Sequence, residues 1–187
     1  MTLENKTAIV TGGSRGIGRA ICVALAEAGA NVVTCYAHGA AGAEETVKLC
    51  EAYGVKASAI RADVAKNEDV QALVTKVKEE YGSIDILVNN AGITKDNLML
   101  KMTEEDFEQV IDTNLKGAFL CIKHVSKHAQ AEAWTHYQHQ QRGRCPWKCR
   151  TGQLCIQQGR LDRYDKVCCE GNRFPWHYRE CGGTGIY

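Results

Sequence analysis

Short apolar runs alternate with amphipathic stretches along the first two-thirds of the chain. Runs rich in β-branched residues are typical of buried strands, and apolar residues three or four positions apart are typical of helices. Strands are expected at Thr7–Thr11, Asn31–Cys35, Lys56–Arg61 and Ile84–Asn89. Helices are expected at Ile17–Ala28, Ala41–Tyr53, Asn67–Tyr81, Thr103–Asn114 and Leu115–Lys127. This alternation predicts an α/β fold with a Rossmann-like, doubly wound parallel sheet.

A glycine-rich turn stands between the first expected strand and the first expected helix. It reads T-G-G-S-R-G-I-G from Thr11 to Gly18. Glycine permits positive φ and close backbone approach, and a helix N-terminus offers free N–H groups to a pyrophosphate. A simple tight turn is the alternative interpretation. The residues expected to hold a dinucleotide here are Gly12, Ser14, Arg15, Gly16, Ile17 and Gly18.

The end of the second strand bears on the choice of cofactor. It reads Tyr36-Ala37-His38, with no carboxylate to accept a hydrogen bond from a ribose 2′-hydroxyl. Arg15 in the glycine turn can pair with a 2′-phosphate, which favours NADPH over NADH. The alternative is that Arg15 is an ordinary solvated residue at a helix start.

Two further strand ends supply candidates for the same site. The carboxyl ends of parallel strands meet at one edge of a sheet, where ligands of such folds lie. Small residues after the fourth strand would let the backbone approach a cofactor, although a plain turn is the alternative. On pattern alone, Asp63 would cap the helix that begins near Asn67. The candidates are Asp63, Val64, Asn90, Ala91 and Gly92.

Five motifs in order resemble the short-chain dehydrogenase/reductases, and within them the 3-oxoacyl-acyl-carrier-protein reductases. The resemblance covers residues 1–127 and implies that Asp63 contacts the adenine and that Val64 packs on its ring. It also implies that Asn114 distorts its helix and holds a water of a proton relay. The motifs are TGGSRGIG from Thr11, DV at Asp63, NNAG from Asn89, ITKDNLMLKM from Ile93 and DTNLKGAF from Asp112.

The resemblance implies a function in fatty-acid synthesis. Cytoplasmic, homotetrameric enzymes of this type use NADPH to reduce a 3-oxoacyl thioester on acyl carrier protein to the 3-hydroxyacyl thioester. The net charge of +1 gives no reason to expect a nucleic-acid partner. The first residues lack the pattern of a signal peptide and no apolar run is long enough for a bilayer, so a cytoplasmic protein with no membrane partner is expected.

The catalytic residues that the resemblance implies are missing from the chain. The family uses a Ser and a Tyr whose pKa is lowered by a Lys four residues later, on the same helix face. Asn114 is therefore the only catalytic residue expected here, and the chain is expected to be inactive. The fold is expected to be C-terminally incomplete, which argues against tetramer assembly. The tyrosines after Asn114, none with Lys at that spacing, are Tyr137, Tyr164, Tyr178 and Tyr187.

Composition changes abruptly after residue 127. Six of the ten cysteines, all three tryptophans and both prolines follow His128. Back-translation from His128 with permitted codons, read one base later, gives RIINISS, then Y-V-S-S-K and N-A-V-A-P-G-F. In the family, P-G-F is followed by Ile and an acidic residue, and the codons ATT GAN for that pair contain TAT TGA in the frame of this chain, which is Tyr followed by a stop codon where the chain has Tyr187. We interpret residues 128–187 as an out-of-frame tail, disordered or loosely packed.

The cysteine-rich tail leaves an alternative open. Thiolates and imidazole suit Zn²⁺, so the chain could be a non-catalytic nucleotide-binding or interaction protein with a metal-binding tail. No cysteine pair there has C-x-x-C spacing, so no metal site is expected. The residues in question are Cys145, Cys149, Cys155, Cys168, Cys169, His177 and Cys181.

Overall fold

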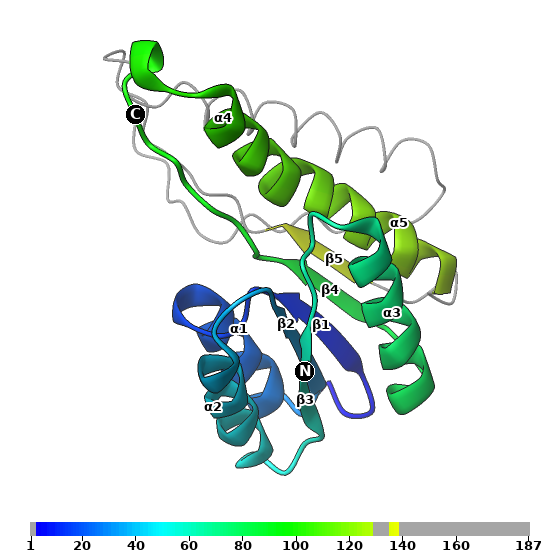
Figure 1. Cartoon of the computed structure of the whole chain (residues 1–187). Helices are drawn as coiled ribbons and strands as arrows, with labels where there is room; N and C mark the ends of the chain where they lie inside the picture. The colour runs from blue at the N-terminus through cyan, green and yellow to red at the C-terminus, as the bar shows by residue number, and fades with distance from the viewer. Residues whose placement is uncertain (1–2, 129–134, 139–187) are drawn as a thin grey trace, which may run out of the picture.

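A parallel sheet forms the centre of the computed structural model, which describes residues 3–128 and 135–138 (Figure 1). The order of its five described strands is β3-β2-β1-β4-β5. The strands are β1 (Thr7–Thr11), β2 (Asn31–Tyr36), β3 (Ala57–Arg61), β4 (Ile86–Asn89) and β5 (Thr135–Gln138). The helices are α1 (Gly16–Glu27), α2 (Ala40–Glu51), α3 (Asn67–Tyr81), η1 (Met99–Lys101), α4 (Glu104–Ile111), η2 (Asp112–Lys116) and α5 (Gly117–His128). The predicted Rossmann-like α/β fold is confirmed.

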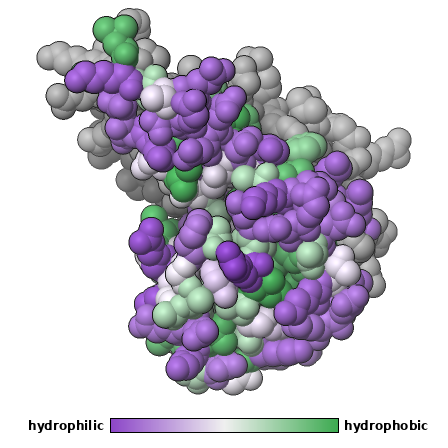
Figure 2. Space-filling model, viewed as in Figure 1, coloured by the Kyte–Doolittle hydropathy of each residue, from purple (hydrophilic) through white to green (hydrophobic). Residues whose placement is uncertain are grey.

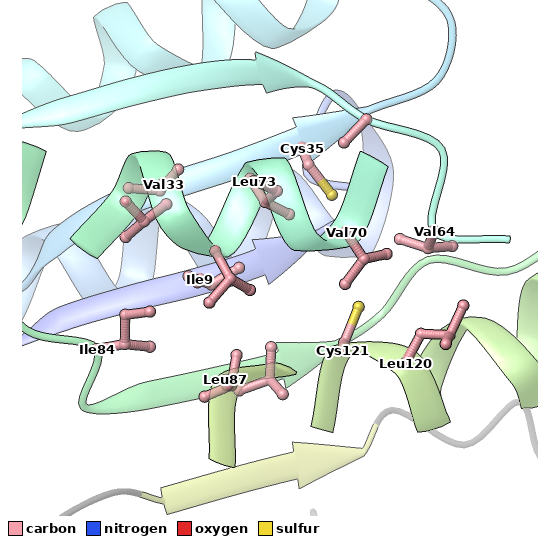
Figure 3. Close-up of a cluster of buried hydrophobic side chains, with 14 of the residues drawn as sticks. Ile9, Val33, Cys35, Val64, Val70, Leu73, Ile84, Leu87, Leu120 and Cys121 are labelled. Carbon is pink, nitrogen blue, oxygen red and sulfur yellow. The ribbon is translucent and has the colours of Figure 1, made fainter. Parts of the chain in front are cut away.

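Alternate residues of the central strand enter two separate cores. Ile9 lies in a cluster with side chains of α3 and α5 on one face of the sheet (Figure 3). Ala8 and Val10 lie in a second cluster, with Cys22 of α1 and Cys50 of α2 on the other face. Hydrophilic residues cover most of the molecular face in Figure 2, as expected for helices that bury only their inner side.

The start of β1 is tied to the entry of β4 by one carboxylate. Asp85 Oδ2 accepts hydrogen bonds from Thr7 N at 2.9 Å and Ser83 Oγ at 2.9 Å, and Oδ1 accepts one from Lys6 Nζ at 3.0 Å. Burial alone would raise the pKa of the Asp85 carboxyl, but these donors outweigh it and hold the pKa below its ordinary value. The ionised carboxylate therefore stabilises the junction of the two strands.

Most predicted elements are present, and the clearest difference in the helices is at their last junction. The sequence predicted separate helices that meet at Asn114 and Leu115, whereas α4, η2 and α5 follow one another without a break. The η2 segment is π-helical. The side chain of Asn114 bonds both backbone groups of Ile93, which anchors the segment where the helix widens.

The sequence predicted a disordered or loosely packed tail from residue 128, but Thr135–Gln138 within it forms the strand β5. That segment pairs in parallel with β4, from Ile86 opposite Thr135 to Asn89 opposite Gln138. Parallel partners of β4 on both sides make it an interior strand of the sheet. Residues 129–134 and 139–187, which hold the rest of the expected tail, lie outside the described residues.

Asp85→Asn should lower the free energy of unfolding by about 1 to 2 kcal/mol near neutral pH, because three donors lose an ionised acceptor. The folded pKa lies below the ordinary 3.8, so this stabilisation is present above that value and is lost as the pH falls through the folded pKa. The difference from wild type should therefore shrink in acid. Urea unfolding at about pH 7 and about pH 3 measures it.

The exposed Asp96 provides the matched control, since its carboxylate makes no described contact. Asp96→Asn should leave stability unchanged at both pH values. An Asp85→Asn variant as stable as wild type near neutral pH would contradict the assignment.

Candidate cofactor-binding site

A cleft of about 880 Å³ opens at the carboxyl ends of the strands. Segments far apart in the sequence form its walls: the glycine turn, the ends of β2 and β3, the loop after β4, and the α4–η2 helix. This is the edge at which ligands of open α/β sheets lie. All eleven residues predicted to bind the cofactor line it: Gly12, Ser14, Arg15, Gly16, Ile17, Gly18, Asp63, Val64, Asn90, Ala91 and Gly92.

Two glycines fix the shape of the turn. Gly12 has φ +70°, and a Cβ added there would lie 2.9 Å from Cα of Ala91, so the turn can lie against the loop after β4. A Cβ at Gly18 would collide with the carbonyl oxygen of Gly12, so α1 can begin directly against the turn. Only glycine allows this packing at both positions.

Asn90 joins the glycine turn to the loop after β4. Its Nδ2 donates to the carbonyl oxygens of Thr11 at 3.0 Å and Gly12 at 3.2 Å. Thr11 Oγ1 in turn accepts from the backbone N–H groups of Asn90 and Ala91, both at 3.0 Å. The amide nitrogen of Asn90 is thus used to hold two walls of the cleft together.

The first turn of α1 faces the cleft without a side-chain cap. Its N-cap residue is Arg15, in extended conformation, and no acidic residue lies in the first turn. Uncapped N–H groups at a helix N-terminus attract anions through hydrogen bonding and the helix dipole. This end of the cleft is suited to a phosphate group.

Arg15 of the glycine turn and His38, which follows β2, both line the cleft. Both side chains are exposed. The described part of the chain gives Arg15 no ion-pair partner, so its guanidinium is available to a ligand. No Asp or Glu from the end of β2 lines the cleft, in agreement with the sequence of that strand.

Asp63 does not cap α3, so that alternative from the sequence was wrong. The N-cap position is Lys66, whose side chain makes no capping hydrogen bond. Asp63 Oδ1 instead accepts from the N–H of Ala65 at 3.0 Å, and its own N–H donates to Asp69 Oδ2 at 2.9 Å. These contacts fix the loop that brings Val64, which is buried, to the cleft wall.

Asn114 lies behind the wall of the cleft and does not line it. Its side chain is 5% exposed. Oδ1 accepts from the N–H of Ile93 at 2.8 Å, and Nδ2 donates to the carbonyl of Ile93 at 2.9 Å. Ile93 itself lines the cleft, so Asn114 positions that wall through one backbone unit. The helix distortion expected at Asn114 is confirmed by η2.

Five polar wall residues, from the α3 entry and the α4–η2 helix, were not predicted from the sequence. The motif DTNLKGAF was recognised, but its spacing alone does not say which side chains meet the cleft. Lys66 follows Asp63 by three positions and carries no motif signal. The missed residues are Lys66, Gln109, Asp112, Thr113 and Lys116.

The described cysteines are free and buried. Burial raises the pKa of the Cys35 thiol, which lines the cleft, to about 11. Burial likewise raises the pKa of Cys22 to about 12. Both thiols are therefore neutral near pH 7 and are poor nucleophiles. The described residues contain no group of three or more potential metal ligands, and the tail cysteines lie outside them.

Comparison with known proteins assigns the fold and cleft to a family. The family model for short chain dehydrogenase matches residues 6–136. The chain belongs to this family. Among solved structures, a short chain dehydrogenase from Burkholderia cenocepacia J2315 in complex with NADP is 31% identical, with a TM-score of 0.87, and the match covers 91% of this chain and 70% of that one. A dehydrogenase/reductase from Sinorhizobium meliloti 1021 is 32% identical, with a TM-score of 0.84, over 91% and 68%.

Within the family, the chain is similar to curated relatives that share one description. A 3-oxoacyl-acyl-carrier-protein reductase of Staphylococcus epidermidis is 52% identical over 122 residues, which are 65% of this chain and 50% of that protein. A protein of the same description from Synechocystis is 47% identical over 125 residues, 67% of this chain and 51% of that protein. The chain thus spans about half the length of the curated relatives it matches.

The match to the family model agrees with the resemblance found in the sequence. The resemblance was expected to end at Lys127, whereas the family model matches as far as residue 136 and β5 also lies beyond Lys127. None of the described helices combines the length and hydrophobicity needed to cross a bilayer.

Gly18→Ala should destabilise the turn more than Gly16→Ala. The added methyl at Gly18 meets the Gly12 carbonyl, whereas a Cβ at Gly16 has no atom within 4 Å and only the φ of +56° opposes it. At Gly16 the left-handed conformation alone costs about 1 to 2 kcal/mol. Gly18 is not left-handed, but its added methyl meets backbone atoms that cannot move aside, and overpacking of this kind costs about 1 to 3 kcal/mol or more. Urea midpoints of the two variants measure the order, and equal midpoints would contradict the described turn.

Proposed function

We propose that residues 1–127 are the NADPH-binding part of a reductase that acts on 3-oxoacyl thioesters carried by acyl carrier protein. One observation carries the proposal: the eleven residues predicted to hold the cofactor, from three separate segments, line a single cleft. The 52% identity to a 3-oxoacyl-acyl-carrier-protein reductase supports the substrate class. In the intact enzyme the product is the 3-hydroxyacyl thioester, made in the cytoplasm by a homotetramer.

Each part of the cleft has chemistry suited to one part of NADPH. The uncapped N-terminus of α1 would hold the pyrophosphate. Arg15 would pair with the 2′-phosphate, because a guanidinium binds phosphate with two parallel hydrogen bonds. Val64 would pack on the adenine ring, and Asp63 would accept a hydrogen bond from the adenine amino group. Asn114 would support a proton relay through the backbone of Ile93.

The bound dinucleotide would supply the hydride, but the chain does not supply the matching proton donor. Reduction of a ketone requires an acid that protonates the nascent alkoxide while the hydride adds to the carbonyl carbon. None of the tyrosines after Asn114 has a lysine four residues later. We therefore expect that the 187-residue chain has no reductase activity and that its tetramer does not assemble.

The proposal includes an out-of-frame origin for residues 128–187. With permitted codons for Thr135–Gln138, the frame shifted by one base gives R-I-I-N, a run with the β-branched residues of a strand. The structure has β5 at these same four positions. This coincidence supports the view that the reading frame changes near the Lys127 and His128 codons.

The deciding experiment compares two proteins made from the same gene. Its sequence is first determined again across the codons for Lys127 and His128. The 187-residue chain and a frame-restored version are then assayed with an acetoacetyl thioester and NADPH. Activity in the restored protein alone is the expected result. Activity in the 187-residue chain refutes the proposed inactivity, and no activity in the restored protein refutes the proposed reaction.

Arg15→Gln should weaken NADPH binding by about tenfold and leave NADH binding almost unchanged, because only NADPH carries the phosphate that pairs with the guanidinium. Fluorescence titration of the 187-residue chain with each nucleotide measures the two affinities. Arg61→Gln is the matched control, since Arg61 is exposed at the end of β3 and does not line the cleft. Equal losses for both nucleotides would contradict the role of Arg15.

A further inference from the structure

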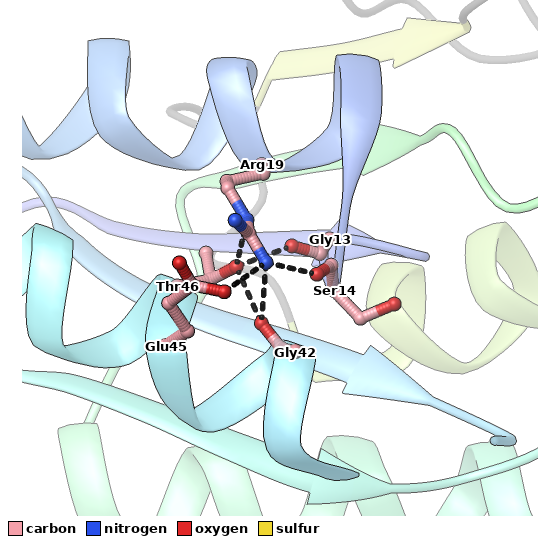
Figure 4. A network of polar contacts seen from close by, with 6 residues as sticks. All are labelled: Gly13, Ser14, Arg19, Gly42, Glu45 and Thr46. Atoms are coloured by element: carbon pink, nitrogen blue, oxygen red, sulfur yellow. Dashed lines mark hydrogen bonds and ion pairs between the residues drawn. The ribbon is translucent and has the colours of Figure 1, made fainter. Parts of the chain in front are cut away.

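Arg19 of α1 connects the glycine turn to α2 (Figure 4). Its Nη2 donates to the carbonyl oxygen of Ser14 at 2.8 Å and to that of Gly42 at 3.2 Å. Its Nε donates to Thr46 Oγ1 at 3.1 Å. Arg19 does not line the cleft. Its guanidinium therefore acts on the turn from the side facing α2.

Thr46 of α2 continues the network to a second carbonyl of the turn. Its Oγ1 lies 2.9 Å from the carbonyl oxygen of Gly13 and 3.0 Å from that of Gly42, and it can donate to either. Thr46 is 1% exposed, so water cannot replace this donor. The carbonyls of Gly13 and Ser14 are thus both held on the α2 side of the turn.

The orientation of these two carbonyls determines the direction of two N–H groups. In a trans peptide, the C=O of one residue and the N–H of the next point in opposite directions, and the described chain has no cis peptide. The N–H groups of Ser14 and Arg15 therefore point away from α2. Neither has an acceptor among the described residues, and both residues line the cleft.

We infer that Arg19 and Thr46 are positioning residues that prepare the glycine turn for a pyrophosphate. Their hydrogen bonds hold the carbonyls of Gly13 and Ser14 on the α2 side, where these dipoles do not face the anion and so do not repel it. The N–H groups of the same two peptide units then point into the cleft, where they attract the anion. This inference rests on the proposed NADPH-binding function. It assigns binding roles to two side chains that do not touch the ligand.

The salt bridge of Arg19 provides a natural control. Arg19 Nη2 also lies 2.9 Å from Glu45 Oε2, but the Glu45 side chain is 61% exposed and makes no described contact with the turn. Exposed ion pairs contribute little to stability. Glu45→Gln therefore removes the ion pair and leaves the hydrogen bonds to Ser14 and Thr46 in place.

The test uses four variants of the 187-residue chain: Arg19→Met, Thr46→Val, Thr46→Ser and Glu45→Gln. Arg19→Met and Thr46→Val should each weaken NADPH binding by about tenfold. Thr46→Ser retains the hydroxyl and should restore most of the affinity lost in Thr46→Val. Glu45→Gln should bind like wild type. Binding of 2′-AMP, which has no pyrophosphate, should change little in any variant, whereas a merely structural role would lower it in parallel.

Amide hydrogen exchange of the peptide that spans the turn gives a second measurement, made without nucleotide. Exchange at Ser14 and Arg15 should be altered in Arg19→Met and Thr46→Val and unchanged in Glu45→Gln.

Unchanged NADPH affinity in both Arg19→Met and Thr46→Val overturns the inference. If wild type binds no NADPH, the proposed function fails, and hydrogen exchange alone decides whether Arg19 and Thr46 orient the turn. Thr46→Val, which preserves side-chain shape, carries the test if Arg19→Met does not fold.

Discussion

The site depends on how the backbone polar groups of one tight turn are satisfied. Between β1 and α1 the chain must bury several carbonyls and still leave N–H groups for a ligand. Asn90 donates hydrogen bonds to the carbonyls of Thr11 and Gly12. Thr46 donates to the carbonyl of Gly13, and Arg19 donates to that of Ser14. Each donor belongs to a different element, so the geometry of the turn is a property of the assembled fold.

The two cores determine where those donors stand. Ile9 faces α3 and α5, while its neighbours in β1 face α1 and α2, so the sheet is covered on both sides. Burial on both faces fixes the register of the central strands, because a slip by one residue would exchange the faces. With the strands fixed, their carboxyl ends form one edge, and the loops that follow them form a single cleft.

The sequence predicted the parts of the fold that local patterns encode. The bounds of β1 and α3 match their predicted ranges, and the glycine turn lies where its spacing indicated. Tertiary contacts explain the rest. Asp63 accepts a hydrogen bond within its loop instead of capping a helix. In the sequence, Arg19 cannot be distinguished from other polar residues on a helix surface, because its role comes from its contact with Thr46 of α2. β5 was missed because Thr135–Gln138 has only four residues and no hydrophobic run, and its place comes from pairing with β4.

The π-helical segment η2 has a consequence for the sequence that encodes it. A π turn amounts to one residue added to an α-helix, and one residue corresponds to about 100° of rotation around the axis. η2 therefore sets the rotational phase of α5 relative to α4. Deleting one residue between Asp112 and Lys116 would turn the face of α5 that carries Cys121 and Val125 away from the sheet. The length of this five-residue segment is thus as constrained as the identity of a core side chain.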